Sequence, residues 1–293
     1  MIEYLGLPLN ASSHGLMIDN MISWVHWVML ILFLGWGIYL VIAVIKFSAK
    51  SNPQADYHGV QSHFSHYIEY GVLIIEAFLL IGLSIPLYAQ LKTTLPNETD
   101  VHHIRIIAQQ FAWNIHYPGA DGEFGDTDIK LVDEESNPIG LVREGSGADD
   151  IVTLNQMHLP VNQQVLIYLS SKDVIHSFGI PEMRVKQDAL PGMTIPVYFT
   201  PTMTSAEFIN KIKDTNRYSP SGNYMGLGQE TWEIFSEEKK NEFRGFQIAC
   251  AQLCGNSHYK MRGFVTVETE EEFNAWLEEE AEYLEEEDED DDW

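Results

Sequence analysis

The side chains best suited to chemistry gather in one segment near the C-terminal end of the chain. Between residues 250 and 261 it holds two thiols, Cys250 and Cys254, then the imidazole of His258 and the thioether of Met261. This is a soft ligand set, which suits copper and poorly suits magnesium or calcium. Two cysteines with three residues between them can each bridge two metals, while the histidine and the methionine bind one metal apiece. The segment therefore predicts a metal site.

Such a site needs a second imidazole, and the sequence offers one upstream. His176 lies in the stretch Asp173-Val174-Ile175-His176-Ser177-Phe178, where we expect it at the end of the strand that contains the apolar run 165–170. A histidine on its own is more often an ordinary, partly buried side chain than a ligand. The prediction that His176 is a ligand therefore depends on the cysteine segment.

Two other interpretations of the cysteines stay open at this point. In an oxidising compartment, a C-x-x-x-C pair could form a disulfide. A structural zinc site is the second alternative, although such sites rarely recruit methionine and more often use C-x-x-C spacing.

Short β-rich runs should position these ligands. They are separated by turn-forming clusters such as Pro118-Gly119-Ala120-Asp121-Gly122, which is typical of an antiparallel sandwich or barrel. An insert of helical composition lies at about 202–242. The expected strand runs are 104–117, 151–154, 165–170, 194–200, 243–249 and 263–267.

The N-terminal part has a different pattern. Residues 21–45 contain no charged side chain, and residues 70–88 contain only Glu76. At about 1.5 Å per residue, helices here would cross the roughly 30 Å hydrocarbon core of a membrane, so we expect a transmembrane hairpin with helices at about 21–46 and 67–91. The alternative is two buried helices of a soluble core. Lys46 and Lys50 place the connecting loop in the cytoplasm, with both chain ends outside.

Charge restricts the partners. The chain of 293 residues carries 17 basic and 43 acidic side chains, a formal charge of -26, which argues against nucleic acid and favours a cationic partner.

The capping box at residues 269–272 predicts a short helix, followed by a disordered acidic tail at 285–292. We therefore expect an external segment at 1–20, the hairpin at 21–91, a β-domain at 92–268 and an acidic C-terminal region at 269–293.

These residues resemble a known family. The pattern C-x-x-x-C-G-x-x-H-x-x-M, the stretch D-V-x-H-S-F before it, the segment Lys186-Gln187-Asp188-Ala189-Leu190-Pro191-Gly192 and the two-helix hairpin are similar to subunit II of the haem–copper cytochrome c oxidases. The resemblance implies a cupredoxin fold, a Greek-key β-barrel or sandwich, with a dinuclear copper A centre. Its implied ligands are His176, Cys250, Cys254, His258, Met261 and the backbone carbonyl of Gln252.

Two positions depart from the usual family pattern. Where Gln252 stands, a Glu commonly contacts a magnesium ion shared with subunit I; an amide oxygen can coordinate magnesium but lacks the charge that it prefers, so the shared ion stays an open alternative. In the aromatic stretch associated with electron entry, Phe111 replaces the first Trp and Trp113 is kept. The other interpretation of both aromatic residues is that they belong to the core of the β-domain.

The family comparison also places acidic residues in the second helix. Glu69 has the position of a family Glu near the mouth of a proton channel. Glu76 lies deeper, where an ionisable group is costly and tends to be functional or paired. We assign Glu69 to a proton path. Glu76 is a weaker candidate for that path, because a structural hydrogen bond is the favoured interpretation of its position.

The resemblance implies a function and partners. A cytochrome c-type donor would deliver electrons to the copper centre, which would pass them to haem in subunit I, where O₂ becomes water with coupled proton pumping. The donor is expected to be a separate protein, since the chain has no C-x-x-C-H motif for haem. Other oxidase subunits and membrane lipid are further partners. The alternatives are a membrane-tethered copper-delivery protein and a subunit of a nitric-oxide-reducing relative.

Overall fold

The computed structural model describes residues 7–54, 57–58, 62–92, 95–97, 101–215 and 245–290. The chain divides into a helical unit, Met17–Thr94, and a β-rich unit that joins Glu3–Leu16 to Leu95–Trp293. The two units are described separately below.

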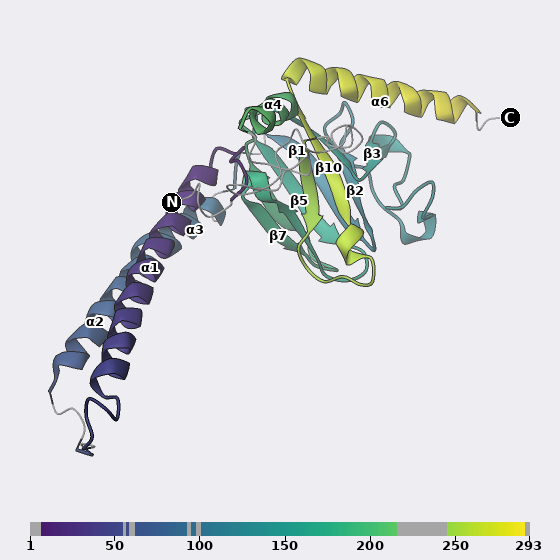
Figure 1. Ribbon diagram of the computed structural model, residues 1–293. Helices are drawn as coiled ribbons and strands as arrows, with labels where there is room; N and C mark the ends of the chain where they lie inside the picture. Colours follow the sequence, from purple (N-terminus) through teal and green to yellow (C-terminus); the bar gives the residue numbers. More distant parts are fainter. Residues whose placement is uncertain are drawn as a thin grey trace. The chain divides into compact units, whose positions relative to one another are not determined.

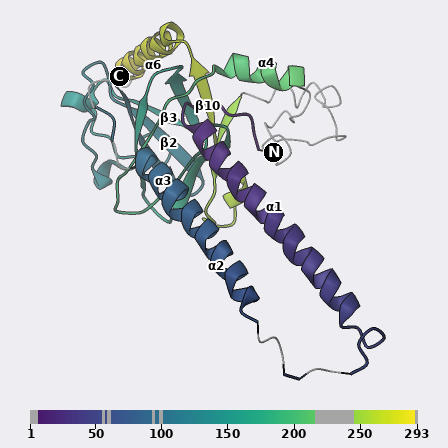
Figure 2. The same cartoon turned by 90° about the vertical axis from the view of Figure 1, so that its left-hand side faces the viewer.

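Two long apolar helices form the helical unit and run in opposite directions (Figure 2). The first is α1 (Gly15–Lys46), and the second is a continuous helical span, Phe64–Lys92. No residue in the most apolar window of either helix is buried. This fits helices that expose apolar side chains to lipid better than the alternative of two helices buried in a soluble core.

Both helices are longer than the uncharged runs that predicted them. Helix α1 starts at Gly15 rather than near residue 21. The prediction began after Asp19 because a charged side chain is costly in lipid, but such a side chain does not prevent a helix. The second span consists of α2 (Phe64–Ala77), a π-helical segment η2 (Phe78–Ser84) and α3 (Ile85–Lys92). Pro86 has no N–H to bond the preceding turn, and the wider π turn just before it accommodates that loss.

Two five-stranded sheets make up the β-rich unit (Figure 1). The first sheet has the order β3 (Ile151–Leu154), β2 (Ala112–Tyr117), β1 (His102–Gln109), β5 (Val165–Ser171) and β8 (Ile195–Phe199). The second has the order β4 (Gln156–Pro160), β10 (Arg262–Glu268), β9 (Phe246–Cys250), β6 (His176–Ile180) and β7 (Val185–Ala189). Within the described residues, four short 3₁₀ turns lie between the strands: η4 (Ile129–Leu131), η5 (Gly145–Gly147), η6 (Pro181–Met183) and η8 (His258–Lys260).

The sandwich was predicted correctly, but its strands are not all antiparallel. Strands β1 and β5 pair in parallel, as do β4 and β10. In addition, the expected run 104–117 is two strands joined by a tight turn at Gln110 and Phe111. Three strands were not expected: β4, β6 and β7. Polar residues such as His158 and Gln187 interrupt the apolar pattern there.

The core fills the space between the two sheets, as alternation along the strands dictates. In β1, Ile104, Ile106 and Ala108 are fully buried, whereas the residues between them are only partly buried. Trp113 and Phe178 are also fully buried, and their rings meet edge to face at 5.7 Å between centroids. An edge-to-face contact is a favourable aromatic geometry, so the core ties the first sheet to the second directly beneath strand β6.

The outer face of the first sheet is covered by the chain between β2 and β3. Asn114 and His116 point away from the core, yet both are fully buried. The Nε2 atom of His116 lies 2.5 Å from a carboxylate oxygen of Asp150, which also accepts hydrogen bonds from the backbone of Gly119 and Gly125. One buried carboxylate therefore fixes this long connection against the sheet.

The N-terminal residues before α1 pack on the β-rich unit. The backbone N–H of Ala11 donates to the carbonyl of Glu182, and that of Ser13 donates to Thr200. Ala11 is fully buried. Residues of the expected external segment 1–20 thus belong in part to the β-rich unit.

Two helices of the described part of the chain pack on the sandwich. Helix α4 (Ser205–Thr215) packs against β10 and lies at the start of the expected insert; residues 216–244 lie outside the described residues. Helix α6 (Glu270–Asp290) packs against β3, β4 and β10. Its capping box is formed: Thr269 and Glu272 exchange side-chain to backbone hydrogen bonds.

Helix α6 continues through residues 285–290, where we expected a disordered tail. Glutamate is a good helix former, and a helix that is already capped and packed gains one backbone hydrogen bond for each residue added. The remaining tail residues, 291–293, lie outside the described residues.

Candidate metal centre

Three segments bring the predicted ligands together at one end of the second sheet. Cys250 is the last residue of β9, and His176 is the first residue of the neighbouring strand β6. Their strands are in register, with Phe178 opposite Cys250. The backbone N–H of Ala251 donates to the carbonyl of Ser177, which continues the ladder to the point where the ligand loop begins. The sequence predicted that His176 ends the strand containing residues 165–170. In the structure it begins the next strand, β6.

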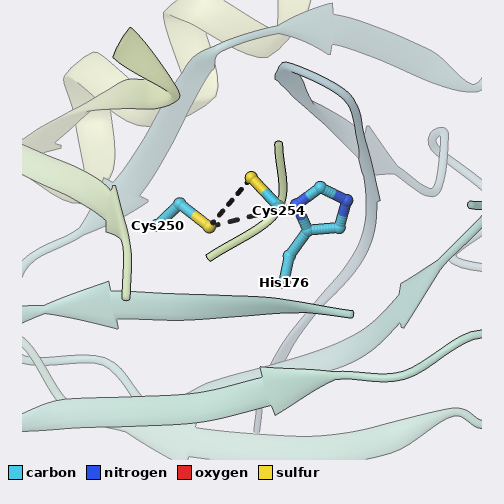
Figure 3. Close-up of side chains that lie close together, drawn as sticks. All are labelled: His176, Cys250 and Cys254. Carbon is cyan, nitrogen blue, oxygen red and sulfur yellow. Dashed lines mark hydrogen bonds between the residues drawn. The ribbon is translucent and has the colours of Figure 1, made fainter. Parts of the chain in front are cut away.

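The first three ligands lie within bonding reach of a shared metal position (Figure 3). The sulfurs of Cys250 and Cys254 are 3.8 Å apart, and Nδ1 of His176 is 3.9 Å from the Cys250 sulfur. All three ligand atoms lie within 4.8 Å of one another. A disulfide would bring the sulfurs to about 2.05 Å, so the two side chains are free thiols with space between them.

The remaining predicted ligands surround Cys254. The Nδ1 atom of His258, in η8, is 3.5 Å from the Cys254 sulfur, and the sulfur of Met261 is 3.6 Å from it. Met261 is buried and connects η8 to β10. Gln252 has an exposed side chain, but its carbonyl accepts a hydrogen bond from the Cys250 thiol at 3.2 Å. The backbone oxygen of Gln252, and not its amide, faces the cluster.

The ring of His176 is oriented by a carboxylate. Its Nε2–H donates to Oδ1 of Asp173 at 2.8 Å, which leaves Nδ1 facing the thiols. Asp173 also accepts hydrogen bonds from the backbone of Val174 and Gln110. A carboxylate behind a histidine ligand fixes the tautomer and the ring angle, and it makes the ligand nitrogen more basic.

The two thiols differ in acidity. Burial opposes ionisation of both, but hydrogen bonds with His176 and with the backbone more than offset it at Cys250, whose pKa falls to about 6. At Cys254, burial and the neighbouring Cys250 raise the pKa to about 11. A metal that takes both sulfurs must displace the protons that they carry, so metal binding releases protons.

The donor set fits copper. Two sulfurs that can each face two metal ions, two imidazole nitrogens, a thioether and a carbonyl converge on a small volume. The thioether beside Cys254 makes a closed zinc site a poor description, because zinc sites are completed by cysteine, histidine or carboxylate. Soft sulfur with imidazole is the combination that copper prefers.

The two aromatic residues assigned to electron entry have different environments. Trp113 is fully buried, and its ring meets His176 edge to face at 6.2 Å between centroids. Phe111 is only partly buried and packs on the edge of the core. A methyl group added at Gly255 would lie 3.0 Å from the Phe111 ring, so this ring lies directly against the ligand loop.

The acidic residues assigned to a proton path lie in the helical unit. Glu69 and Glu76 are both on α2 with exposed side chains, and Glu69 is 3.5 Å from Nδ1 of His66. They belong to the helical unit, whereas the predicted metal ligands belong to the β-rich unit.

Sequence reasoning missed two residues of this site. Asp173 was present in the quoted D-V-x-H-S-F stretch, but its role as the partner of His176 was not assigned. Gln110 directly precedes the aromatic residue Phe111, but neither its type nor its spacing indicates a role in the site. A carboxylate three residues before a histidine ligand is a signal that could have identified Asp173.

Comparisons with known proteins identify relatives of this chain. Residues 102–208 match the family model described as cytochrome c oxidase subunit II, periplasmic domain. The alternative cytochrome c oxidase subunit 2 of Bradyrhizobium diazoefficiens is 30% identical over 264 residues, which cover 89% of this chain and 79% of the relative. The probable cytochrome c oxidase subunit 2 of Rickettsia prowazekii is 26% identical over 86% of this chain and 66% of the relative.

Solved structures were also matched. The periplasmic domain of subunit II of cytochrome oxidase from Bradyrhizobium japonicum shares 23% sequence identity, with a TM-score of 0.38 over 65% of this chain and 99% of that structure.

The fold and the site define a two-sheet, cupredoxin-like domain with a soft metal-ligand cluster, joined to helices able to span a membrane. The chain belongs to the cytochrome c oxidase subunit II family. Members of this family are subunits of a haem–copper terminal oxidase, which is an oxidoreductase.

Proposed function

We propose that this chain is the electron-accepting subunit of a cytochrome c oxidase and holds a dinuclear copper A centre. The carrying observation is the convergence of the two free thiols with Nδ1 of His176 within 4.8 Å, with no bond between the sulfurs. The ligands would be His176, Cys250, Cys254, His258, Met261 and the Gln252 carbonyl. When bound, the two coppers would supply one-electron chemistry between a cytochrome c-type donor and haem in subunit I, where O₂ is reduced.

The work of the protein residues is to hold the ligands still. Cys250 and His176 lie at the ends of adjacent paired strands. Met261 directly precedes β10, the strand that pairs with β9, and its carbonyl accepts a hydrogen bond from the backbone N–H of Cys250 at 3.2 Å. Three ligands are therefore fixed by sheet hydrogen bonds rather than by a mobile loop. Rigid ligands suit electron transfer, because the site then changes little between its oxidised and reduced states.

Electron entry fits Phe111 better than Trp113. Trp113 is wholly enclosed by the core and cannot touch another protein, whereas Phe111 is partly exposed and lies against Gly255, next to Cys254. We assign Phe111 to the contact between donor and centre. Trp113 packs behind His176 and restrains its ring.

The membrane arrangement is proposed from the sequence. Lys46 and Lys50 follow α1, which favours a cytoplasmic connection and places both chain ends and the β-domain on the periplasmic side. Glu69 would then lie at the cytoplasmic start of the second helix and Glu76 about two turns deeper. Their assignment to a proton path is supported by the cost of placing a carboxyl group among lipid chains.

The partners follow from charge and ligand set. The formal charge of -26 favours a basic donor and excludes nucleic acid, and long-range attraction of this kind weakens with salt. Subunit I and other oxidase subunits would cover the helices. A magnesium ion shared with subunit I stays open, because the Gln252 side chain offers a neutral amide.

Copper content and electron paramagnetic resonance of the full chain in detergent test this proposal. After copper loading and oxidation, we expect two coppers per chain and the spectrum of one unpaired electron shared between two equivalent coppers. Cys250→Ser should abolish that spectrum. One copper per chain with a spectrum confined to a single ion, or a Cys250–Cys254 disulfide in the loaded protein, would refute the copper A assignment.

A further inference from the structure

The tight turn between β1 and β2 touches both segments that carry the metal ligands. We infer that Gln110, in this turn, is a positioning residue of the metal centre that locks the cysteine loop to the aspartate behind His176. The inference rests on the proposed copper centre and adds a residue to it. No chemistry is assigned to Gln110 itself.

Gln110 makes two short hydrogen bonds in two directions. Its backbone N–H donates to Oδ2 of Asp173 at 2.6 Å, while Oδ1 of the same carboxylate accepts from His176. Its side-chain Nε2 donates to the carbonyl of Cys254 at 2.5 Å. A residue in the turn between two strands of the first sheet thus connects Asp173, which orients His176, to the backbone of Cys254.

The space around this contact is shaped for it. Gly255 has a φ of +135°, a conformation that residues with a side chain rarely adopt. A Cβ atom there would lie 2.8 Å from Nε2 of Gln110 and 3.0 Å from the Phe111 ring. The bare backbone after Cys254 therefore lets the amide and the ring approach closely.

The cysteine loop needs a restraint of this kind. Cys254 is buried, but Leu253 before it is 78% exposed and Gln252 is also exposed. Packing therefore does not fix the backbone on this side of the loop. A directed hydrogen bond to the Cys254 carbonyl does so, and it limits how far the Cys254 sulfur can move from its 3.8 Å separation from Cys250.

The adjacent residue provides a matched control. Gln109 is also a glutamine in the same hairpin, but its side chain bonds Glu134 and Asn114, on the side of the first sheet away from the ligands. Replacing either glutamine by methionine keeps the length of the side chain and removes its hydrogen bonds. Only Gln110→Met removes a bond to the metal loop.

The experiment compares copper-loaded full chains in detergent: the unchanged protein, Gln110→Met and Gln109→Met. We measure copper release to a copper(I) chelator and the copper hyperfine splitting. Loss of partners behind metal ligands typically weakens metal retention by about 10–100-fold. We expect copper release from Gln110→Met to be faster by about that factor, with altered hyperfine splitting, while Gln109→Met behaves like the unchanged protein.

Release rates and splittings that are the same in all three proteins would overturn the inference, as would an equal change in both variants. If Gln110→Met does not fold, Gln110→Glu takes its place, since it has the same shape and a carboxylate that repels the Cys254 carbonyl. Failure of the unchanged chain to bind two coppers would instead overturn the proposed function, and the two failures are thus distinguishable.

Discussion

Two histidine–aspartate pairs lie at different sheets of the domain, and their carboxylates differ in burial: Asp150 is buried, whereas the side chain of Asp173 is 28% exposed. His176 donates to Asp173 at 2.8 Å in the metal centre, and His116 contacts Asp150 at 2.5 Å on the outer face of the first sheet. Both imidazoles are fully buried. The difference lies at the second ring nitrogen: Nδ1 of His176 faces the thiol of Cys250, whereas Nδ1 of His116 has no hydrogen-bond partner in the described part of the chain.

The surroundings shift the pKa values of the two histidines in opposite directions. Burial lowers the pKa of both, but at His176 hydrogen bonds with Cys250 and Asp173 outweigh it and raise the pKa. At His116, burial outweighs the contribution of Asp150, and the pKa falls. The same pair of side chains therefore orients a proposed ligand in one place and fastens a long connection in the other. The two pairs are distinguished by what Nδ1 of each histidine faces.

The largest effect should come from removing the structural carboxylate. Asp150→Ala leaves His116 and the backbone N–H groups of Gly119 and Gly125 buried without their acceptor. Breaking a buried pair in this way costs about 3–5 kcal/mol. We expect thermal unfolding of the domain at a clearly lower temperature, while folded protein still binds two coppers. An unchanged unfolding temperature, or copper loss from folded protein, would break the comparison.

A buried carboxyl without an imidazole sharpens the comparison. Glu182 is 7% exposed, one of its oxygens has no partner within the described residues, and burial raises its pKa to about 7. The native state keeps this proton up to about pH 7, whereas the unfolded chain releases it near 4.3. The stabilisation is therefore complete at low pH and is lost as pH rises to about 7.

Glu182→Gln is neutral at every pH and should remove this dependence. We expect the variant to match the unchanged protein at pH 3, below the unfolded pKa, and to be more stable at pH 8 by about 4 kcal/mol at most, since the two pKa values differ by about 2.7 units and each unit is worth about 1.36 kcal/mol. Thermal unfolding of both proteins at the two pH values measures the difference. Equal stability at pH 8 would mean that Glu182 is not held protonated by the fold.

Removing the charge behind His176 should affect copper more than stability. Asp173→Asn keeps the shape of the side chain but weakens its bond to His176. Copper affinity should fall by about 10–100-fold, as is typical for such partners. The measurement is competition with a copper chelator, with the unfolding temperature of the metal-free protein as a control. A fall in the unfolding temperature as large as that of Asp150→Ala, with copper affinity unchanged, would reverse the roles given to the two pairs.

The smallest effect should occur far from both pairs. Thr269→Ala removes the side chain that caps α6, and loss of such a cap costs about 1 kcal/mol. Copper binding and its spectrum should stay unchanged. A changed copper spectrum in this variant would show that α6 is coupled to the centre, which the contacts of the helix do not predict.

Much of the fold could be predicted from patterns with a strong physical signal. Apolar runs about as long as the hydrocarbon core of a membrane is thick, or longer, predicted both helices, and apolar alternation predicted six of the β runs. Strands β4, β6 and β7 could not be found this way. In β6, all five residues are buried, including His176 and Ser177, so polar and apolar positions do not alternate. In β7, polar residues fill the middle of the strand.

The predicted ligands of the candidate site were found because cysteine, histidine and methionine at these spacings have few other uses. The structure brings His176, Cys250, Cys254, His258 and Met261 together, with the Gln252 carbonyl beside them. Gln110 could not be predicted. It lies far from the cysteines in sequence, and only the pairing of β1 with β2 brings its amide to Cys254.

The most direct test of the central claim is the rate of electron transfer into haem. Oxidase complexes containing either the unchanged chain or Cys250→Ser are mixed rapidly with reduced cytochrome c, and haem reduction is followed optically. If electrons enter through this centre, haem reduction should be fast in the first complex and nearly absent in the second, although both contain the same haem. Haem reduction at the same rate in both complexes would contradict the account.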